Sequence, residues 1–510
     1  MEDLSASRLG QDPPSEPVKL VDYYNTTLAG LLDRRAPLKT KTVTVRPQVP
    51  WYSEEIREAK RARRRAERKW RTTRSVADFV SFKRHKNNVT HLLKEGKSAF
   101  LTDFISQNSD NQGKLFRAVK NLLVKTKSLC FSDYTDKSAR ANDIGKYFVQ
   151  KISRLREELD QGYVPNDQSY VLDDSVVNSD STIPPIRIEA FELLAEDDVR
   201  VLIANSRSTS CCLDPIPTHL LKSCSESLIS VITNIINSSF ESRIFPDCWK
   251  EAVVTPLLKK PGLVSLFKNL RPVTNLAYIS KLTERAVFNQ IYDHLVRSGL
   301  YPQLQSPYHR YHSTETALIE VANDILLNMS SQRVTLLVLL DLSAAFDTVD
   351  HAILLRLLTT DFGIGEKALE PFSSYLSGRS QRVLFDGATS DSFDLRFGVP
   401  KGSCLGPLLF VVYASKLFEI AQDHLPNAHC LADDTQLYFT FDPNGPTGQA
   451  MALEAMERCI NDLRKWMNRD KLKINDDKTE FLVIGSRQNL LKIHHCSVRV
   501  GTTVTPCNYL

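Results

Sequence analysis

The order of apolar and polar positions divides the chain into a helical front part and a mixed α/β remainder. From residue 51 to about residue 123, apolar positions recur at helical spacing among many basic ones, and residues 141–159 predict another amphipathic helix. Beyond Ile186, apolar segments alternate between helical and strand spacing, with Pro and Gly between them. We therefore expect one large α/β (α+β) unit over about residues 186–490.

Two segments lack such a pattern. Residues 1–50 are rich in Pro, Ser and Thr, which is typical of a flexible leader, and residues 161–185 form a polar, Asp- and Ser-rich stretch typical of a linker. The expected organisation is a leader (1–50), a basic, mainly helical connector (51–160), a linker (161–185), the α/β unit (186–490) and the start of a C-terminal region (491–510).

One apolar run ends at a candidate functional carboxylate. Residues 334–340, VTLLVLL, predict a strand that is buried on both faces, and Asp341 follows it directly. Ligand sites in open α/β sheets collect at strand ends. A helix is expected to begin near Thr348, with Asp347 as its N-cap and Asp350 in a capping box. Capping accounts for Asp347 and Asp350 but not for Asp341, which lies several residues before the helix.

Two adjacent acids, Asp433 and Asp434, interrupt a strand pattern in HCLADDTQLY (429–438). By itself the pair is more typical of a surface turn than of a metal site. A hairpin tip beside Asp341 would bring three carboxylates together, and they would repel unless divalent cations lay among them. Mg²⁺ binds a few carboxylates together with substrate phosphates, and two such ions about 4 Å apart serve nucleotidyl transfer. A metal site is therefore the second interpretation of this pair.

Charge is concentrated in the connector. The chain has a net charge of only +5, yet residues 57–97 hold 15 Lys and Arg against 4 Asp and Glu. Ser53 can cap a helix over this segment, and Glu54 and Glu55 suit its first turn. A solvated helix face is one interpretation. We favour a nucleic-acid-binding arm, because the basic residues outnumber the acidic ones by too many for all of them to form salt bridges along the helix. Its candidate phosphate contacts are Arg61, Arg63, Arg64, Arg65, Arg68 and Lys69.

The first ten residues show no basic segment followed by an apolar core, so we expect no secretory signal. The longest apolar run, residues 334–340, is far shorter than the roughly 20 residues of a membrane helix. The 10 cysteines are scattered without metal-binding spacing, which is typical of a reducing compartment. We therefore expect an intracellular protein, in the nucleus, the cytoplasm or both, with no membrane partner.

Seven blocks in a fixed order resemble the reverse transcriptases of non-long-terminal-repeat (LINE-type) retrotransposons. They are WKEAVVTPLLKKPG (249–262), FKNLRPVTNLAYISKLTE (267–284), QSPYHRYHSTETAL (305–318), DLSAAFDTVDH (341–351), FGVPKGSCLGPLLF (397–410), LADDTQLYF (431–439) and LKINDDKTEFLVIG (472–485).

This resemblance covers about residues 186–490, with the core blocks at 249–485. It implies a right-hand polymerase with fingers and palm that copies RNA into DNA with two Mg²⁺ ions, or with Mn²⁺ in their place. The implied partners are an RNA template, a DNA primer and dNTPs, together with element RNA and an endonuclease supplied elsewhere. We expect the helical thumb to be truncated.

The resemblance also assigns catalytic roles. Asp341 matches the first metal-binding carboxylate of the palm, and Asp433 and Asp434 match the pair in the palm hairpin. Phe346 matches the aromatic ring that excludes a ribose 2′-hydroxyl by steric overlap. Lys478 matches a lysine near the leaving pyrophosphate, where general-acid help is useful.

Other residues match the nucleotide-binding positions of the family. Lys259, Lys260 and Arg271 resemble the cations that hold the incoming triphosphate, where Arg suits bidentate contacts and Lys supplies a point charge. Gly402 lies in a glycine-rich stretch before an apolar helix, where small residues let the backbone approach a nucleotide. Lys401 departs from the family, which usually has Gln there in contact with substrate.

Two alternatives stay open at this point. One is a catalytically weak or inactive nucleic-acid-binding remnant, suggested by Lys401 and by the expected loss of the thumb. The other is an RNA-dependent RNA polymerase built on the same palm, which Phe346 disfavours.

Overall fold

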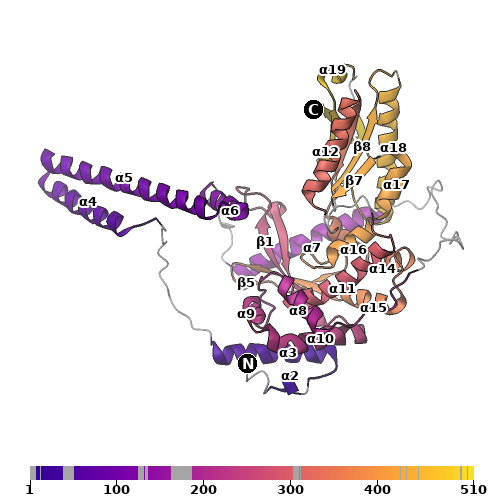
Figure 1. Cartoon of the computed structure of the whole chain (residues 1–510), viewed down its shortest axis with the longest axis horizontal. Helices are drawn as coiled ribbons and strands as arrows, with labels where there is room; N and C mark the ends of the chain where they lie inside the picture. The colour runs from indigo at the N-terminus through magenta and orange to yellow at the C-terminus, as the bar shows by residue number, and fades with distance from the viewer. Residues whose placement is uncertain are drawn as a thin grey trace. The chain divides into compact units, whose positions relative to one another are not determined.

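The computed structural model describes residues 7–11, 13–37, 51–123, 131, 136–161, 186–302, 309, 312–425, 427–431, 434–445, 447–493, 497–501 and 503–509. Asp433 and most of the expected linker lie outside these ranges. The chain forms two compact units, drawn in Figure 1. The larger unit comprises Met1–Pro37, Phe131–Leu257 and Leu266–Leu510, and the smaller comprises Leu38–Cys130 and Leu258–Ser265.

A six-stranded sheet in the order β10-β11-β9-β3-β8-β7 lies in the described part of the larger unit. Its central strand β3 is antiparallel to both of its neighbours, β8 and β9. The run of apolar residues in β3 is buried along nearly its whole length, so the predicted two-faced burial is confirmed. The strands are β3 (Val334–Leu340), β7 (Asn427–Leu431), β8 (Asp434–Phe441), β9 (Glu480–Ile484), β10 (Ser497–Val500) and β11 (Thr503–Tyr509).

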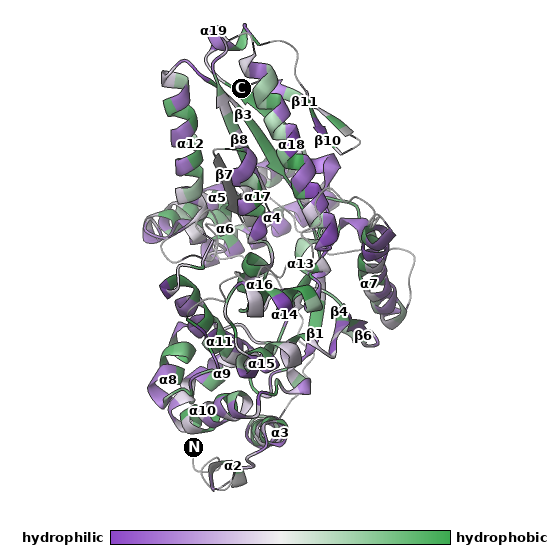
Figure 2. Cartoon of the chain, turned by 90° about the vertical axis from the view of Figure 1, so that its right-hand side faces the viewer, coloured by the Kyte–Doolittle hydropathy of each residue, from purple (hydrophilic) through white to green (hydrophobic). Residues whose placement is uncertain are grey.

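Helices cover both faces of this sheet, and in Figure 2 they stand on either side of its apolar strands. On one face, α12 (Thr314–Ser330) packs through Val321 against Leu337 and Tyr438. On the other face lie α17 (Lys416–His424) and α18 (Gly448–Arg469). Because side chains alternate along β3, Leu336 and Val338 join the main core instead.

A second sheet of the larger unit has the strand order β2-β1-β4-β5, with β6 paired to β4. Its central pair, β1 and β4, is parallel. The strands are β1 (Glu251–Leu258), β2 (Leu270–Asn275), β4 (Arg379–Phe385), β5 (Ala388–Thr389) and β6 (Phe393–Leu395). The helices that complete this part are α8 (Glu196–Asn205), α9 (Thr218–Ser223), α10 (Ser225–Ser242), α11 (Tyr278–Arg297), α13 (Ala345–Thr348), α14 (His351–Thr360), α15 (Glu366–Leu376) and α16 (Gly406–Tyr413).

The expected domain boundaries need three corrections. Residues 17–35 are not a flexible leader but the helix α3 (Pro17–Arg35), which buries an apolar stripe in the core of the larger unit. The helix α7 (Lys137–Gln161) belongs to the larger unit and not with the basic connector. The strands β10 and β11 extend the six-stranded sheet, because β11 pairs with β9, so the α/β unit does not end at residue 490.

The smaller unit contains the predicted basic helix, which folds back on a second one. The helix α4 (Glu54–Thr73) begins as predicted, with the Ser53 hydroxyl accepting a hydrogen bond from the Ile56 N–H at 3.3 Å. It packs along α5 (Val76–Gln107), and the Trp70 ring stacks on Phe82 at 5.5 Å between centroids. The helix α6 (Gln112–Leu123) follows. None of the described helices of either unit is long and apolar enough to span a membrane.

Candidate active site

Asp341 leaves the central strand β3 and is held by a loop that precedes β9. Its carboxylate Oδ2 accepts hydrogen bonds from Asn475 Nδ2 at 2.8 Å and from Lys478 Nζ at 2.9 Å. The two segments are also joined by their backbones, since the Asn475 N–H donates to the Asp341 carbonyl at 2.8 Å and Leu342 forms a bridge with Ile474. The position of this carboxylate is therefore fixed on both its backbone and its side chain.

Asp434 is the first residue of β8 and lies beside Asp341 by strand register. Leu340 pairs with Thr435 in the antiparallel ladder, so the next pair of positions is Asp341 and Asp434. Directly opposed residues of antiparallel strands have Cα atoms about 4.5–5.5 Å apart. The predicted hairpin is confirmed, because β7 pairs with β8 and Leu431 lies opposite Asp434. Asp434 is solvent-exposed, and Asp433 lies outside the described residues.

The donor set at these strand ends fits a hard divalent cation. Carboxylate oxygens are the ligands that Mg²⁺ prefers, and Asp341 and Asp434 supply them from neighbouring strands. Within the described ranges there is no cluster of three or more His, Cys, Asp or Glu side chains suited to a metal ion. The third carboxylate of the predicted set, Asp433, lies outside the described residues.

Phe346 lies in the short helix α13, five residues after Asp341. Its ring stacks on Phe410 of α16 with 4.6 Å between centroids and an interplanar angle of 27°. The Val399 N–H donates to the Phe346 carbonyl at 2.8 Å. Phe346 is therefore held by the stacking of its ring on Phe410 and by a backbone hydrogen bond to the loop that contains Val399.

Gly398 sits where no larger residue fits. Its φ is +86°, and a Cβ atom there would lie 2.8 Å from backbone atoms of Asp347 and Phe346. Its N–H donates to the Val349 carbonyl at 2.8 Å, and the His351 Nε2 donates to the Gly398 carbonyl at 2.8 Å. Burial lowers the pKa of His351, so a neutral imidazole holds this loop near neutral pH.

Asp350, and not Asp347, caps the helix that follows. The Asp350 carboxylate accepts from the N–H groups of Ala352 and Ile353, and the regular helix α14 begins at His351. The prediction of a helix start near Thr348 with Asp347 as its N-cap is therefore wrong. Val349 and Asp350 have non-helical backbone angles and separate α13 from α14, and Asp350 is extended.

Asp347 instead forms an ion pair with Lys401, with 2.5 Å between Oδ2 and Nζ. The next residue, Gly402, has a φ of +79°, and a Cβ there would lie 2.5 Å from the Thr274 carbonyl of β2. Lys401 is thus held between the Phe346 segment and the strand that carries Arg271, whose side chain is exposed.

The Asp347–Lys401 pair should contribute modestly to stability. Both side chains are only partly buried, so Lys401→Gln or Asp347→Asn alone is expected to lower the unfolding free energy by at most about 1 kcal/mol. In a double-mutant cycle measured by urea unfolding, the two changes should couple by roughly 0.5 kcal/mol. Strictly additive changes would show that the pair contributes nothing measurable.

The remaining predicted residues lie in the smaller unit. Lys259 and Lys260 follow β1 and are both exposed. On α4, Arg61, Arg64, Arg65, Arg68 and Lys69 are exposed and Arg63 is partly buried, while Lys69 is paired with Asp78 at 2.9 Å.

Two supporting residues were not predicted from the sequence. Asn475 lies in one of the recognised blocks, and an amide three residues before Lys478 is a weak signal for a second partner of Asp341. Glu284 of α11 is fully buried and accepts from the N–H groups of Cys404 and Leu405, just before α16. Burial raises the pKa of Glu284. An acidic residue at a core position of a helix is the signal that could have identified it.

Comparison with known proteins gives the class to which this arrangement belongs. Residues 258–510 match the family described as "Reverse transcriptase (RNA-dependent DNA polymerase)". Among curated relatives, the probable RNA-directed DNA polymerase from transposon BS of Drosophila melanogaster is 27% identical over 58% of this chain and 32% of its own length. That from transposon X-element of the same organism is 25% identical over 69% of this chain and 38% of its own length.

A third relative, the RNA-directed DNA polymerase from mobile element jockey of Drosophila melanogaster, is 24% identical over 54% of this chain and 30% of its own length. The mixed α/β fold and these matches define a polymerase domain of the reverse transcriptase family. More narrowly, the chain belongs with the reverse transcriptases of non-long-terminal-repeat, LINE-type retrotransposons. It spans about a third of the length of these curated relatives.

Proposed function

We propose that the chain is an RNA-directed DNA polymerase that joins dNTPs to a DNA primer along an RNA template. One observation carries this proposal: in a domain of the reverse transcriptase family, the strand register brings Asp341 and Asp434 to adjacent positions. The six-stranded sheet would then correspond to the palm, and the second sheet, which has five strands in the described residues, would correspond to the fingers.

The carboxylates would hold the metal ions of the reaction. Asp341, Asp434 and Asp433 are proposed as ligands of two Mg²⁺ ions, with Mn²⁺ as a substitute. Bound there, such ions would lower the pKa of the primer 3′-hydroxyl and neutralise charge on the triphosphate. Asn475 and Lys478 hold the Asp341 carboxylate in place through their hydrogen bonds.

The other residues of the site would select and position the nucleotide. The Phe346 ring, backed by Phe410, would overlap with a ribose 2′-hydroxyl and so favour dNTPs. Lys478, whose side chain is largely exposed, could turn from Asp341 to protonate the leaving pyrophosphate. Lys259, Lys260 and Arg271 would contact the triphosphate, and Lys401 and Gly402 would line the nucleotide site.

The basic helix α4 is proposed as a nucleic-acid-binding arm. Its exposed arginines lie on the face away from the Trp70 contact with α5, and they outnumber the acids near them. A one-signed cationic surface displaces counterions from phosphates and so binds polyanions without sequence preference. Element RNA and an endonuclease are proposed as further partners.

Neutralising the arm should weaken RNA binding in a salt-dependent way. Changing Arg61, Arg64, Arg65 and Arg68 to Gln removes four charges, so the slope of log K against log salt should fall by about 3 in magnitude on single-stranded RNA. Fluorescence anisotropy over a salt series measures both affinity and slope. The matched variant with four Lys at these positions should keep the wild-type slope. Deletion of residues 57–97 without loss of binding would exclude this role.

The polymerase function is tested with the wild-type chain, an RNA template, a labelled DNA primer and Mg²⁺. We expect extension with dNTPs, little extension with rNTPs, and none in EDTA. Preferential use of rNTPs would favour an RNA-dependent RNA polymerase. Salt-sensitive RNA binding with no extension under any of these conditions would mean that the chain is a binding remnant.

A further inference from the structure

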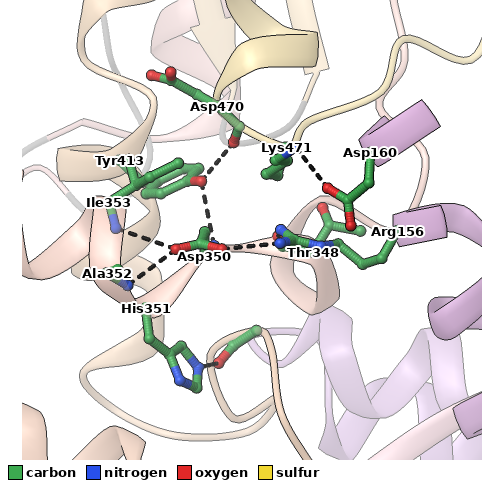
Figure 3. A network of polar contacts seen from close by, with 11 residues as sticks. Arg156, Asp160, Thr348, Asp350, His351, Ala352, Ile353, Tyr413, Asp470 and Lys471 are labelled. Atoms are coloured by element: carbon green, nitrogen blue, oxygen red, sulfur yellow. Dashed lines mark hydrogen bonds and ion pairs between the residues drawn. The ribbon is translucent and has the colours of Figure 1, made fainter. Parts of the chain in front are cut away.

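The helix α7 lies upstream of every recognised sequence block, yet it contacts two segments linked to Asp341: residues 348–350, which follow it in the chain, and residues 471–473, which precede its partner Asn475. Figure 3 shows Arg156 of this helix pointing toward Thr348 and Asp350, and Asp160 pointing toward Lys471. Arg156 and Asp160 of α7 make these contacts.

Arg156 forms the most buried part of this contact. One guanidinium nitrogen, Nη1, donates to the Thr348 carbonyl at 3.1 Å, and Nη2 donates to the Asp350 Oδ2 at 2.9 Å. The guanidinium carbon also lies 4.2 Å from the centre of the Phe397 ring. The Arg156 side chain is 7% exposed, so these bonds are largely shielded from water, whereas the ion pairs of Lys137 and Glu158 on the same helix are exposed.

The partners of Arg156 flank the proposed steric gate. Thr348 lies two residues after Phe346, and Phe397 directly precedes Gly398, which is tied to the Phe346 segment. Burial alone would raise the pKa of Asp350, but the N–H groups of Ile353 and Ala352 and the Arg156 guanidinium lower it, so this carboxylate is charged near neutral pH.

The helix α7 also contacts the segment that precedes Asn475, one of the hydrogen-bond partners of Asp341. Asp160 pairs with Lys471 at 2.5 Å and Glu158 pairs with Lys473 at 2.6 Å. The Lys473 carbonyl accepts the Ser343 N–H at 2.8 Å, and Asn475 follows two residues later. Tyr413 links the two contacted segments, because its hydroxyl donates to the Asp470 carbonyl at 2.5 Å and accepts the Asp350 N–H at 3.2 Å.

We propose that the C-terminal turns of α7 are a clamp that positions Asp341 and Phe346, and that Arg156 is its principal positioning residue. The inference rests on the proposed polymerase function for its kinetic consequences, but the clamp itself is a property of the fold. Arg156 acts through Thr348, Asp350 and Phe397 and does not touch the nucleotide. Substitution of a residue that orients metal ligands without binding the metal typically lowers metal affinity or activity by about 10- to 100-fold.

The kinetic test compares Arg156→Ala and Arg156→Lys with the wild-type chain in primer extension. Arg156→Ala should lower kcat/KM for dNTPs by about 10- to 100-fold and reduce the preference for dNTPs over rNTPs, because Phe346 is no longer fixed. Arg156→Lys keeps the charge, but an ammonium group cannot bind the Thr348 carbonyl and the Asp350 carboxylate while it stacks on the Phe397 ring. This variant should therefore lose less kcat/KM than Arg156→Ala but should not reach the wild-type value.

The matched control is Lys137→Ala, which removes an exposed ion pair of the same helix with Asp386. This variant should retain the wild-type kinetic constants and dNTP preference. Circular dichroism at the assay temperature identifies any variant that is unfolded. An Arg156→Ala variant with wild-type kcat/KM and wild-type dNTP preference would overturn the proposal.

Hydrogen–deuterium exchange tests the clamp without catalysis. In Arg156→Lys, and in Arg156→Ala where it is folded, amides of residues 346–351 and 471–475 should exchange at least about tenfold faster than in the wild type, while Lys137→Ala should leave them unchanged. Unchanged exchange in Arg156→Lys would overturn the clamp. A wild-type chain that shows no extension would contradict the polymerase proposal, and the exchange comparison would still decide the clamp.

Discussion

Replacement of Asp341 by asparagine is expected to lower primer extension by about three orders of magnitude or more. The amide has nearly the shape of the carboxylate but lacks the negative charge that a divalent cation needs. Asn475 and Lys478 would lose a charged acceptor, but Lys478 is largely exposed, so the loss of stability should stay below about 1 kcal/mol. The measurement is the rate of single-nucleotide incorporation at saturating dNTP, together with the urea unfolding midpoint.

An exposed aspartate of the same unit provides the control for this prediction. Asp423→Asn on α17 makes the same chemical change away from the strand ends. It should retain both the incorporation rate and the unfolding midpoint. Equal losses in Asp341→Asn and Asp423→Asn would show that the change in charge acts through the whole molecule and not through this site.

Replacement of Gly398 by alanine is expected to destabilise the larger unit by about 2–4 kcal/mol and to remove most of the activity. The added Cβ would lie 2.8 Å from the Asp347 and Phe346 backbone, in a conformation with a φ of +86°. Relief requires displacement of the Phe346 segment, which carries the proposed steric gate. Urea unfolding followed by circular dichroism measures the first effect, and primer extension measures the second.

Gly387→Ala separates steric overlap from backbone conformation. Gly387 also has a positive φ, +82°, but a Cβ added there would have no neighbouring atom within 4 Å among the described residues. Its replacement should cost about 1 kcal/mol and leave activity unchanged. If the two alanine variants lose the same stability and activity, the close approach at Gly398 is not important.

The elements of the site that could be predicted from sequence depend on local patterns. The strand at residues 334–340 is predictable because six of its seven residues are apolar, a pattern typical of a strand that is buried on both faces. The hairpin around Asp434 was recognisable because its strands are contiguous along the chain. The register that places Asp341 beside Asp434 is a long-range property that no local pattern carries, although the resemblance of the ordered blocks implies that the two carboxylates share a site.

The errors arose where tertiary contacts outweigh local composition. Residues 17–35 carry Leu20, Val21, Tyr24 and Leu28 at helical spacing, but the surrounding Pro, Ser and Thr suggested a leader. The capping role went to Asp350 because Asp347 is engaged by Lys401, which lies 54 residues away. No local signal announces such a pair.

The contacts of α7 show the same limit most clearly. Arg156 and Asp350 are 194 positions apart, and nothing in an amphipathic helix of mixed charge marks one arginine as buried. Only the packing of α7 within the larger unit reveals the contacts on which the proposed clamp rests.

The most direct test of the polymerase proposal is single-turnover incorporation of one dNTP on an RNA template in Mg²⁺ by the wild-type chain and by the Asp433→Asn/Asp434→Asn variant. Both proteins should bind the primed template with similar affinity. The proposal predicts metal-dependent incorporation by the wild type and its loss, by about a thousandfold or more, in the variant. Equal rates of nucleotide incorporation by the wild type and the variant would contradict the proposal.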